Sequence, residues 1–202
     1  TVFYYNPNIS AEEEYRKRVE EQKRFISEFP AKYKVSFIEG DYDTKEFYDI
    51  AKGYEQCREG GERCFRCYEL RLRKTCETAK AGGFDYFTTT LTISPLKNSV
   101  RLNEIGLKLS EEYDMPYLLS DFKKKEGYKR SIELSAQYHL YRQNYCGCIY
   151  SRIQAEKKEQ EKMMKKLFLE GYSKNAIAEA FECLPETVTA RIKRAEEDMN
   201  GT

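Results

Sequence analysis

The residues best suited to chemistry in this chain are its seven cysteines. Four of them form two close pairs, Cys64-x-x-Cys67 and Cys146-Gly-Cys148. An odd, clustered set is unlike the even, dispersed cysteines of a small secreted protein, so we expect a reducing cytoplasmic location. The single histidine, His139, excludes a two-histidine metal site. We therefore expect cysteine thiolates to carry out any soft-metal binding or redox chemistry.

The first pair follows a double-glycine loop and opens a helix predicted from about Cys64 to Lys80. A spacing of three puts both sulfurs on one helix face. The unpaired amides at the helix start should lower the pKa of the first thiol. The pattern is shared by redox pairs, zinc sites and iron–sulfur clusters, and two cysteines can also simply pack as small apolar residues.

The second pair encloses a glycine, whose backbone freedom a tight disulfide ring would require. Three interpretations stay open: Cys146 and Cys148 relay two electrons, they add ligands to a metal held with Cys64 and Cys67, or they are inert. The solitary cysteines are expected to be core or surface thiols, namely Cys57, Cys76 and Cys183.

Composition sets the scale of the molecule. The 202 residues are 40% hydrophobic and 14% aromatic, with 35 basic and 34 acidic side chains, which is enough for one domain and an appendage. No apolar run is long enough to cross a membrane, and the opening residues show no secretory leader.

Two stretches, residues 62–80 and 121–145, are each locally basic and are interleaved with tyrosines. This combination suggests that RNA binds beside the cysteines. The alternative interpretation is that each stretch is a solvated helix face.

Strand and helix signals alternate through residues 1–152. Strands are expected at 2–6, 33–38, 84–93 and 116–119, and helices at 10–29, 43–52, 64–80, around 102–109 and at 129–139. Ser10 and Glu13 form a capping box for the first helix. The alternation predicts an α/β fold with a parallel sheet covered by helices on both faces. Residues 6–8, 88–94 and 120–121 should then line the ligand-binding rim.

Residues 153–202 differ in style and form a separate all-helical segment. Three helices are expected, with Gly171 ending the first, Ser173 capping the second and Pro185 opening the third. The segment resembles a helix-turn-helix, which makes DNA a candidate partner through its last helix at Thr187, Thr189, Arg191 and Arg194. A net charge of −1 over residues 154–202 favours the alternative of a helical cap.

Several ordered motifs resemble those of the QueH-type epoxyqueuosine reductases. They run from residue 1 to about 152 and include Tyr5-Asn-Pro-Asn-Ile9, Cys64-x-x-Cys67-Tyr-Glu-Leu-Arg-Leu, Tyr86-Phe-Thr-Thr-Thr-Leu-Thr-Ile-Ser-Pro95, Asp121-Phe-Lys-Lys-Lys and Leu140-Tyr-Arg-Gln-Asn-Tyr-Cys-Gly-Cys148. The resemblance implies a tRNA-modifying enzyme that reduces epoxyqueuosine to queuosine at the wobble position. It also implies an α/β fold related to the PP-loop (Rossmann-like) nucleotide-binding enzymes.

The resemblance further implies a [4Fe-4S] cluster, and leaves open an additional iron. Cys64 and Cys67 match cluster ligands, and Cys146 and Cys148 match the family's Cys-x-Cys pair, a redox disulfide. The family's adjacent Cys-Cys pair follows a strand that would precede residue 2. We therefore expect that the first βα unit is missing from this sequence and that the activity of this chain depends on it.

Converting an epoxide to an alkene needs two electrons and two protons, from an electron donor that the sequence does not identify. We expect Cys146 and Cys148 to store the electrons and Asp121 to donate a proton, with iron ligand or helix cap as its alternatives. RNA-binding residues are expected at Lys123, Lys124, Lys125, Arg130, Arg142 and Tyr145. Two other functions compete: a zinc-stabilised nucleic-acid-binding protein with a helix-turn-helix tail, and a metal-free thiol oxidoreductase.

Overall fold

A computed structural model describes residues 1–200, which fold as two compact units. The first unit runs from Thr1 to Ile149, and the second begins at Tyr150. Among the helices of the described residues, none combines the length and the apolar character needed to cross a bilayer.

The first unit is an α/β structure in which helices predominate over a small parallel sheet. Strand β1 (Val2–Tyr4) pairs with β2 (Phe37–Glu39), and helix α1 (Glu12–Glu28) connects them. The three elements form a βαβ unit, because parallel neighbours need a crossover connection. Buried Tyr15 and Val19 on α1 pack toward the strands. The predicted strand at 33–38 is thus displaced toward its carboxyl end.

The start of α1 corrects one prediction. The residue before the helix is Ala11, and its side chain makes no capping hydrogen bond. Ser10 instead directs its backbone N–H to the carbonyl oxygen of Gly147, at 3.1 Å. The predicted capping box is therefore wrong, because a tertiary contact takes the serine. The acidic first turn, Glu12 to Glu14, still complements the helix dipole.

The strongest predicted strand, residues 84–93, forms only one isolated parallel bridge, between Phe87 and Tyr117. The predicted strand at 116–119 contributes no more than that bridge. Threonine hydroxyls divert the backbone: the Thr89 side chain accepts from the Leu91 N–H and opens a short 3₁₀ helix, η1 (Thr90–Ile93). Such local side-chain bonds compete with a sheet ladder.

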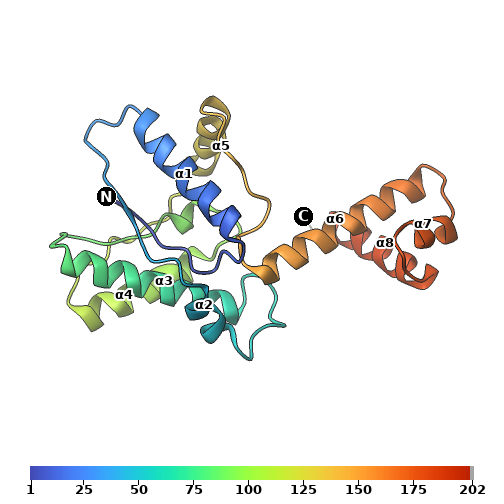
Figure 1. Cartoon of the computed structure of the whole chain (residues 1–202), viewed down its shortest axis with the longest axis horizontal. Coiled ribbons are helices and arrows are strands. Elements are labelled where there is room, and N and C mark those ends of the chain that lie inside the picture. Colours follow the sequence, from blue (N-terminus) through green and yellow to red (C-terminus); the bar gives the residue numbers. More distant parts are fainter. Residues whose placement is uncertain (201–202) are drawn as a thin grey trace. The chain divides into compact units, whose positions relative to one another are not determined.

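The main core lies between two long helices, α3 (Glu62–Ala81) and α4 (Ser99–Tyr113), which lie side by side (Figure 1). Leu72 and Cys76 on α3 meet Leu102 and Leu109 on α4, and all four are at most 2% exposed. Both helices were predicted from their periodicity. Preceding them, α2 (Thr44–Ala51) is capped by Asp43, whose carboxylate accepts from the Lys45 N–H at 2.9 Å, so the helix begins where the sequence predicts.

The last helix of the first unit before the second cysteine pair is α5 (Gly127–Gln137). Its end meets α1, where the rings of Phe25 and Tyr138 lie 5.3 Å apart. Figure 1 shows α1 and α5 on one side of the two strands and α3 and α4 on the other. Helices therefore flank the small sheet on two sides within this unit.

The second unit is a three-helix structure. Its helices are α6 (Ile149–Leu169), α7 (Lys174–Ala180) and α8 (Pro185–Asn200), and they share a core of Met164, Ile177, Val188 and Ile192. Ser173 caps α7 by accepting from the Ala176 N–H, and Pro185 opens α8, so both predicted signals are confirmed.

The second unit does not present α8 as a typical DNA-reading helix. Arg191 donates to Gln160 at 3.0 Å, and Arg194 pairs with the buried carboxylate of Glu161 at 3.3 Å. Two arginines predicted to contact DNA thus also bind α6, and the Arg194 side chain is 53% exposed. The charge of Arg194 stabilises the unit, because the buried carboxylate of Glu161 needs a partner.

Candidate active site

All four paired cysteines line one cavity of about 730 Å³ in the first unit. Cys64 and Cys67 reach it from the first turns of α3, and Cys146 and Cys148 reach it from the loop after α5. The turn that follows β1 borders the same cavity. The cavity therefore extends along β1 and includes the turn at the carboxyl end of that strand, the place where open α/β sheets bind ligands.

Cys64 and Cys67 are both buried, each 8% exposed. The N–H of Gly60, in the loop before α3, donates to Cys64 Sγ at 3.2 Å. Burial nevertheless outweighs that hydrogen bond and raises the pKa of Cys64. Burial also raises the pKa of Cys67, to about 11. The expected lowering of the Cys64 pKa is therefore wrong, because desolvation disfavours the thiolate more than the amides favour it.

Cys146 and Cys148 are not joined by a disulfide. Cys146 Sγ donates a hydrogen bond to Cys148 Sγ at 3.4 Å. A disulfide needs the sulfurs at about 2.05 Å. The two thiols are therefore adjacent in the dithiol state, and closing a bridge between them requires only a small movement.

Three residues from the start of the chain hold the backbone of this dithiol loop. Asn8 Nδ2 donates to the Cys146 carbonyl at 3.5 Å, and Arg18 Nη1 donates to the same oxygen at 3.1 Å. The Ser10 N–H binds the next carbonyl, that of Gly147. The turn after β1 and the first turns of α1 therefore position the second cysteine pair.

Gly147 is required by its backbone and by its neighbours. Its φ is +112°, a region that side chains rarely adopt, and a Cβ there would lie 2.7 Å from Ile9 Cγ1 and 3.1 Å from Arg18 Nη1. The glycine lets the dithiol loop approach the turn after β1 closely. Sequence reasoning assigned this glycine to disulfide ring closure; the structure adds a packing requirement.

Lys97 is a cavity residue that sequence reasoning missed. Its side chain is 12% exposed, and its ammonium donates to Glu59 Oε1 at 3.0 Å. Burial acts to lower the Lys97 pKa, but the charges of Cys146, Tyr68 and Glu59 outweigh it and raise the pKa. The one sequence signal was its place, just after the predicted strand at 84–93. A buried cation therefore lies within electrostatic reach of the dithiol.

Two arginines from the predicted basic cluster at 62–80 serve the fold. Arg63 is 1% exposed, and it donates to the carbonyl oxygens of Tyr54 and Glu55 at 3.2 and 2.9 Å. Arg71 donates to the Tyr5 carbonyl at 3.2 Å and to Asn6 Oδ1 at 2.6 Å. Arg71 thus ties the turn after β1 to α3, the helix that carries Cys64 and Cys67.

Asp121 does not line the cavity, and its carboxylate pairs with Lys123 at 3.3 Å and with Lys124 at 3.4 Å. Burial acts to raise the pKa of Asp121, but the hydrogen bonds and charges of the two lysines outweigh it and lower the pKa. The carboxyl is therefore ionised near neutral pH. The structure gives no support to Asp121 as the proton donor.

The predicted RNA-binding residues are spread over the surface. Tyr145 lines the cavity, with the Arg18 guanidinium 5.5 Å from its ring centroid. Lys125 is exposed and has no ion pair within the described residues. Arg130 pairs with Glu133 at 3.0 Å, and Arg142 donates to Ser135 Oγ at 3.1 Å. The structure thus brings only Tyr145 of this set to the cysteines.

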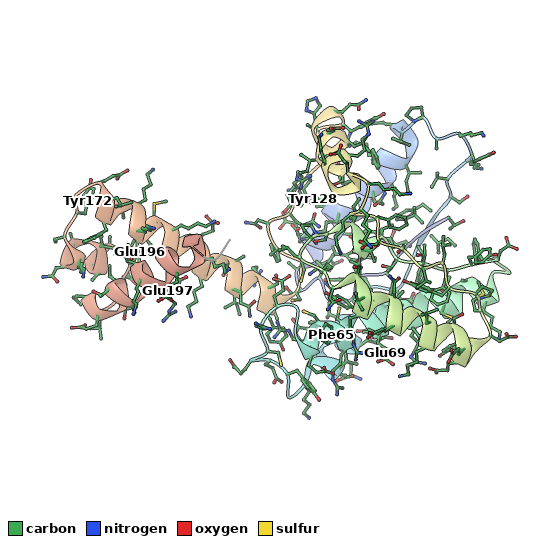
Figure 2. The ribbon with its side chains drawn as sticks, turned by 180° about the vertical axis from the view of Figure 1, so that it is seen from behind. Phe65, Glu69, Tyr128, Tyr172, Glu196 and Glu197 are labelled. Carbon is green, nitrogen blue, oxygen red and sulfur yellow. The ribbon has the colours of Figure 1, made fainter. Side chains whose placement is uncertain are left out.

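The tyrosines predicted to stack on RNA are likewise dispersed. Tyr128 lies on α5, apart from Phe65 and Glu69 on α3 (Figure 2). Tyr68, by contrast, is buried in the cavity wall beside Cys67. The interleaving seen in the sequence therefore does not become one continuous stacking surface.

The cysteines do not assemble into a complete metal site among the side chains that the structure describes. No three of the described His, Cys, Asp or Glu side chains gather closely enough to hold a metal ion. A [4Fe-4S] cluster takes four thiolates. Cys64 and Cys67 supply two thiols on one helix face, so the described residues fit one edge of a cluster and not the whole.

Four thiols around one cavity of an α/β unit define a thiol-based redox or metal-binding protein. The family model described as "Epoxyqueuosine reductase QueH" matches residues 1–154 of this chain. A relative of that name from Streptococcus pyogenes serotype M1 is 46% identical over 153 residues, which is 75% of this chain and 60% of the relative. The chain belongs to the QueH family, and the resemblance of its motifs is confirmed.

Two other relatives of the same name show how sequence identity and coverage vary. The Staphylococcus epidermidis protein is 40% identical over 156 residues, or 75% of this chain and 66% of the relative. The Thermotoga maritima protein is 35% identical over 162 residues, or 79% of this chain and 82% of the relative. The chain thus spans about 60–66% of the length of the first two relatives.

Proposed function

We propose that this protein is an epoxyqueuosine reductase that acts on the wobble nucleoside of tRNA. One observation carries the proposal: within a chain of the QueH family, all four paired cysteines line a single cavity. The volume of about 730 Å³ is in the range of small-molecule sites, so the cavity has room for a nucleoside.

The dithiol supplies a balanced source of electrons for this reaction. An epoxide becomes an alkene by taking up two electrons and two protons and releasing its oxygen as water. Oxidation of Cys146 and Cys148 to a disulfide releases two electrons and two protons, and the adjacent sulfurs favour that step. An external dithiol or equivalent electron donor then restores the thiols.

The proposed cofactor is an iron–sulfur cluster with Cys64 and Cys67 as two of its ligands. Their common helix face and their place in the cavity support this assignment. The described residues supply part of the ligand set and do not complete it. The same thiols would serve a different soft metal equally well, which makes metal content a decisive measurement.

We also propose how the substrate is held. Tyr145 at the cavity is suited to stack on the base, and exposed Lys125 to contact a phosphate; Lys123, Lys124, Arg130 and Arg142 are further phosphate candidates. Asp121 then orders the lysine run through its ion pairs with Lys123 and Lys124. A cytoplasmic location follows from a tRNA substrate.

The two units are proposed to differ in role. Residues 1–152 form the reductase domain, of a PP-loop-like fold, which the βαβ unit supports. Residues 153–202 form a helical tail. Binding of DNA by this tail has no support from Arg191 and Arg194, which bind α6.

The proposal is tested by the reaction itself. Protein reconstituted anaerobically with iron and sulfide is given tRNA that carries epoxyqueuosine, together with a chemical reductant. The tRNA is digested, and the nucleosides are identified by mass spectrometry. Conversion to queuosine, a loss of one oxygen atom, supports the proposal. Binding of this tRNA no tighter than binding of unmodified tRNA, together with an unchanged nucleoside, contradicts it.

A further inference from the structure

The hydroxyl of Tyr68 is a buried hydrogen-bonding group that the fold leaves unsatisfied. Tyr68 is 3% exposed, and its hydroxyl has no hydrogen-bond partner among the described residues. Leaving such a group unpaired costs about 1–3 kcal/mol. Because buried polar groups are almost always paired, this hydroxyl points to a ligand that supplies the missing acceptor.

The surroundings of the hydroxyl place it inside the cysteine cavity. Tyr68 lines the cavity, and the charged groups that act on it are Lys97, Cys64, Cys67 and Cys146. Burial is the main cause that raises the pKa of Tyr68, to about 12. The Tyr68 side chain therefore belongs to the same cavity wall as the cysteines, and its hydroxyl is buried.

A second donor shares this part of the cavity. The Lys97 ammonium has three donors, and the hydrogen bond that the described residues give it is to Glu59, at 3.0 Å. Cysteine thiols are weak acceptors and cannot satisfy either group well. The corner of the cavity lined by Tyr68 and Lys97 thus offers two donors, and the described residues give the Tyr68 hydroxyl no acceptor.

The charge of this corner selects between possible acceptors. Glu59 pairs with Lys97 and compensates its charge, so the corner offers no net positive charge for a phosphate. An uncharged oxygen atom suits this corner better than a phosphate does. Among uncharged oxygens, an ether-type oxygen suits two donors best, because it accepts hydrogen bonds and has no proton to donate.

We propose that the Tyr68 hydroxyl donates a hydrogen bond to the epoxide oxygen of the bound nucleoside, with Lys97 as a second donor to the same oxygen. The inference rests on the proposed function and adds to it the residue that recognises the atom to be removed. Tyr68 is thereby a catalytic residue that touches substrate, distinct from the thiols that supply electrons.

Binding to two tRNAs that differ by that one oxygen tests the inference. The dissociation constants of the purified protein are measured for tRNA carrying epoxyqueuosine and for tRNA carrying queuosine. We expect the wild-type chain to prefer the epoxide form about five- to tenfold, the usual worth of one hydrogen bond. Tyr68→Phe should abolish this preference by weakening binding of the epoxide form alone. Lys97→Gln should reduce it without removing it.

A matched control is Tyr117→Phe. Tyr117 is also buried, but its hydroxyl already donates to Asn103 at 3.1 Å, and it does not line the cavity. This variant should keep the wild-type preference. Thermal unfolding of each variant shows whether it folds, and Lys97→Gln provides the same test if Tyr68→Phe does not.

The outcomes separate the two proposals. A wild-type preference that Tyr68→Phe leaves unchanged overturns the role of Tyr68 and leaves the proposed function standing. Equal binding of both tRNAs by the wild-type chain also overturns the inference. Failure of the wild-type chain to bind either tRNA overturns the inference and the proposed function together.

Discussion

Arg18 on α1 donates a hydrogen bond to the carbonyl oxygen of Cys146 at 3.1 Å, across 128 positions of sequence. The same guanidinium pairs with Glu14 at 2.7 Å and reaches the Tyr145 carbonyl at 3.4 Å. One side chain thus joins the βαβ unit to the dithiol loop. The geometry of the second cysteine pair depends on a helix far from it in the chain.

Replacing Arg18 should destabilise the first unit. Its side chain is 9% exposed, so Arg18→Met removes buried charge-assisted hydrogen bonds and leaves the Glu14 carboxylate without its ion pair. We expect a loss of about 2–3 kcal/mol in the free energy of unfolding, measured by urea denaturation. Arg16→Met is the control, because Arg16 makes exposed ion pairs worth about 0–1 kcal/mol. Equal losses in both variants would contradict a structural role for Arg18.

Gly147→Ala should cost more than the same change at Gly53. Both glycines have positive φ, +112° and +82°, but a Cβ at Gly53 meets nothing within 4 Å, whereas one at Gly147 meets Ile9 and Arg18. The Gly53 variant reports the backbone penalty alone, about 1 kcal/mol. We expect Gly147→Ala to lose about 1–3 kcal/mol more in urea denaturation. A loss no larger than that of Gly53→Ala would mean that the dithiol loop shifts freely.

Alkaline pH should destabilise the fold through its buried tyrosines. Burial and the Glu39 charge raise the pKa of Tyr15 to about 12, above the value of about 10 for an unfolded tyrosine. The stabilisation is complete below pH 10 and is lost as the pH rises through 12, because the unfolded chain releases the proton first. Each such tyrosine contributes a slope of up to about 1.4 kcal/mol per pH unit.

Tyr15→Phe should therefore flatten the alkaline slope, measured by urea denaturation at pH values from 8 to 11. Tyr4, whose pKa is also raised to about 12 by burial, keeps its share of the slope. Tyr33→Phe is the control, since Tyr33 is 74% exposed and should leave the slope unchanged. A Tyr15→Phe slope as steep as that of the wild type would remove Tyr15 from the explanation.

Cys64→Ser should lower the iron content of protein reconstituted anaerobically, because it removes a proposed thiolate ligand. Metal analysis and the visible absorption spectrum measure the loss. Cys183→Ser, which changes a thiol of the second unit, is the control and should retain iron. Colourless protein with stoichiometric zinc in the wild type would favour the zinc-stabilised alternative. Unchanged iron in Cys64→Ser would remove this residue from the site.

The lysines at 124 and 125 should differ in their contribution to tRNA binding. Lys124 pairs with Asp121 at 3.4 Å, whereas Lys125 has no such pair within the described residues. Lys125→Ala should weaken tRNA binding. It should also reduce the slope of the logarithm of affinity against the logarithm of salt concentration by about 1, the value for one phosphate contact. Lys124→Ala should change the tRNA affinity and its salt dependence less than Lys125→Ala does. Identical salt dependence in wild type and Lys125→Ala would leave Lys125 a solvated side chain.

Local signals were sufficient for most helices and for the nature of the chemistry. Asp43, Ser173 and Pro185 mark helix starts because capping and φ preferences act within a few residues. The two cysteine pairs identified the reactive groups, and the ordered motifs identified the family. The same reasoning failed at residues 84–93, where threonine side chains compete with the sheet that their β propensity predicts.

Only the tertiary structure decided what each charged or polar residue does. Arg63 and Arg71 belong to a stretch that the sequence predicts as a basic surface, but their guanidinium groups bind backbone carbonyls. The sequence predicts no cavity role for Lys97 or Tyr68, but both line the cavity. The physical reason is the distance along the sequence over which each kind of interaction acts. Periodicity and caps act between neighbours in sequence, whereas burial, ion pairing and pKa depend on groups that meet only when the chain has folded.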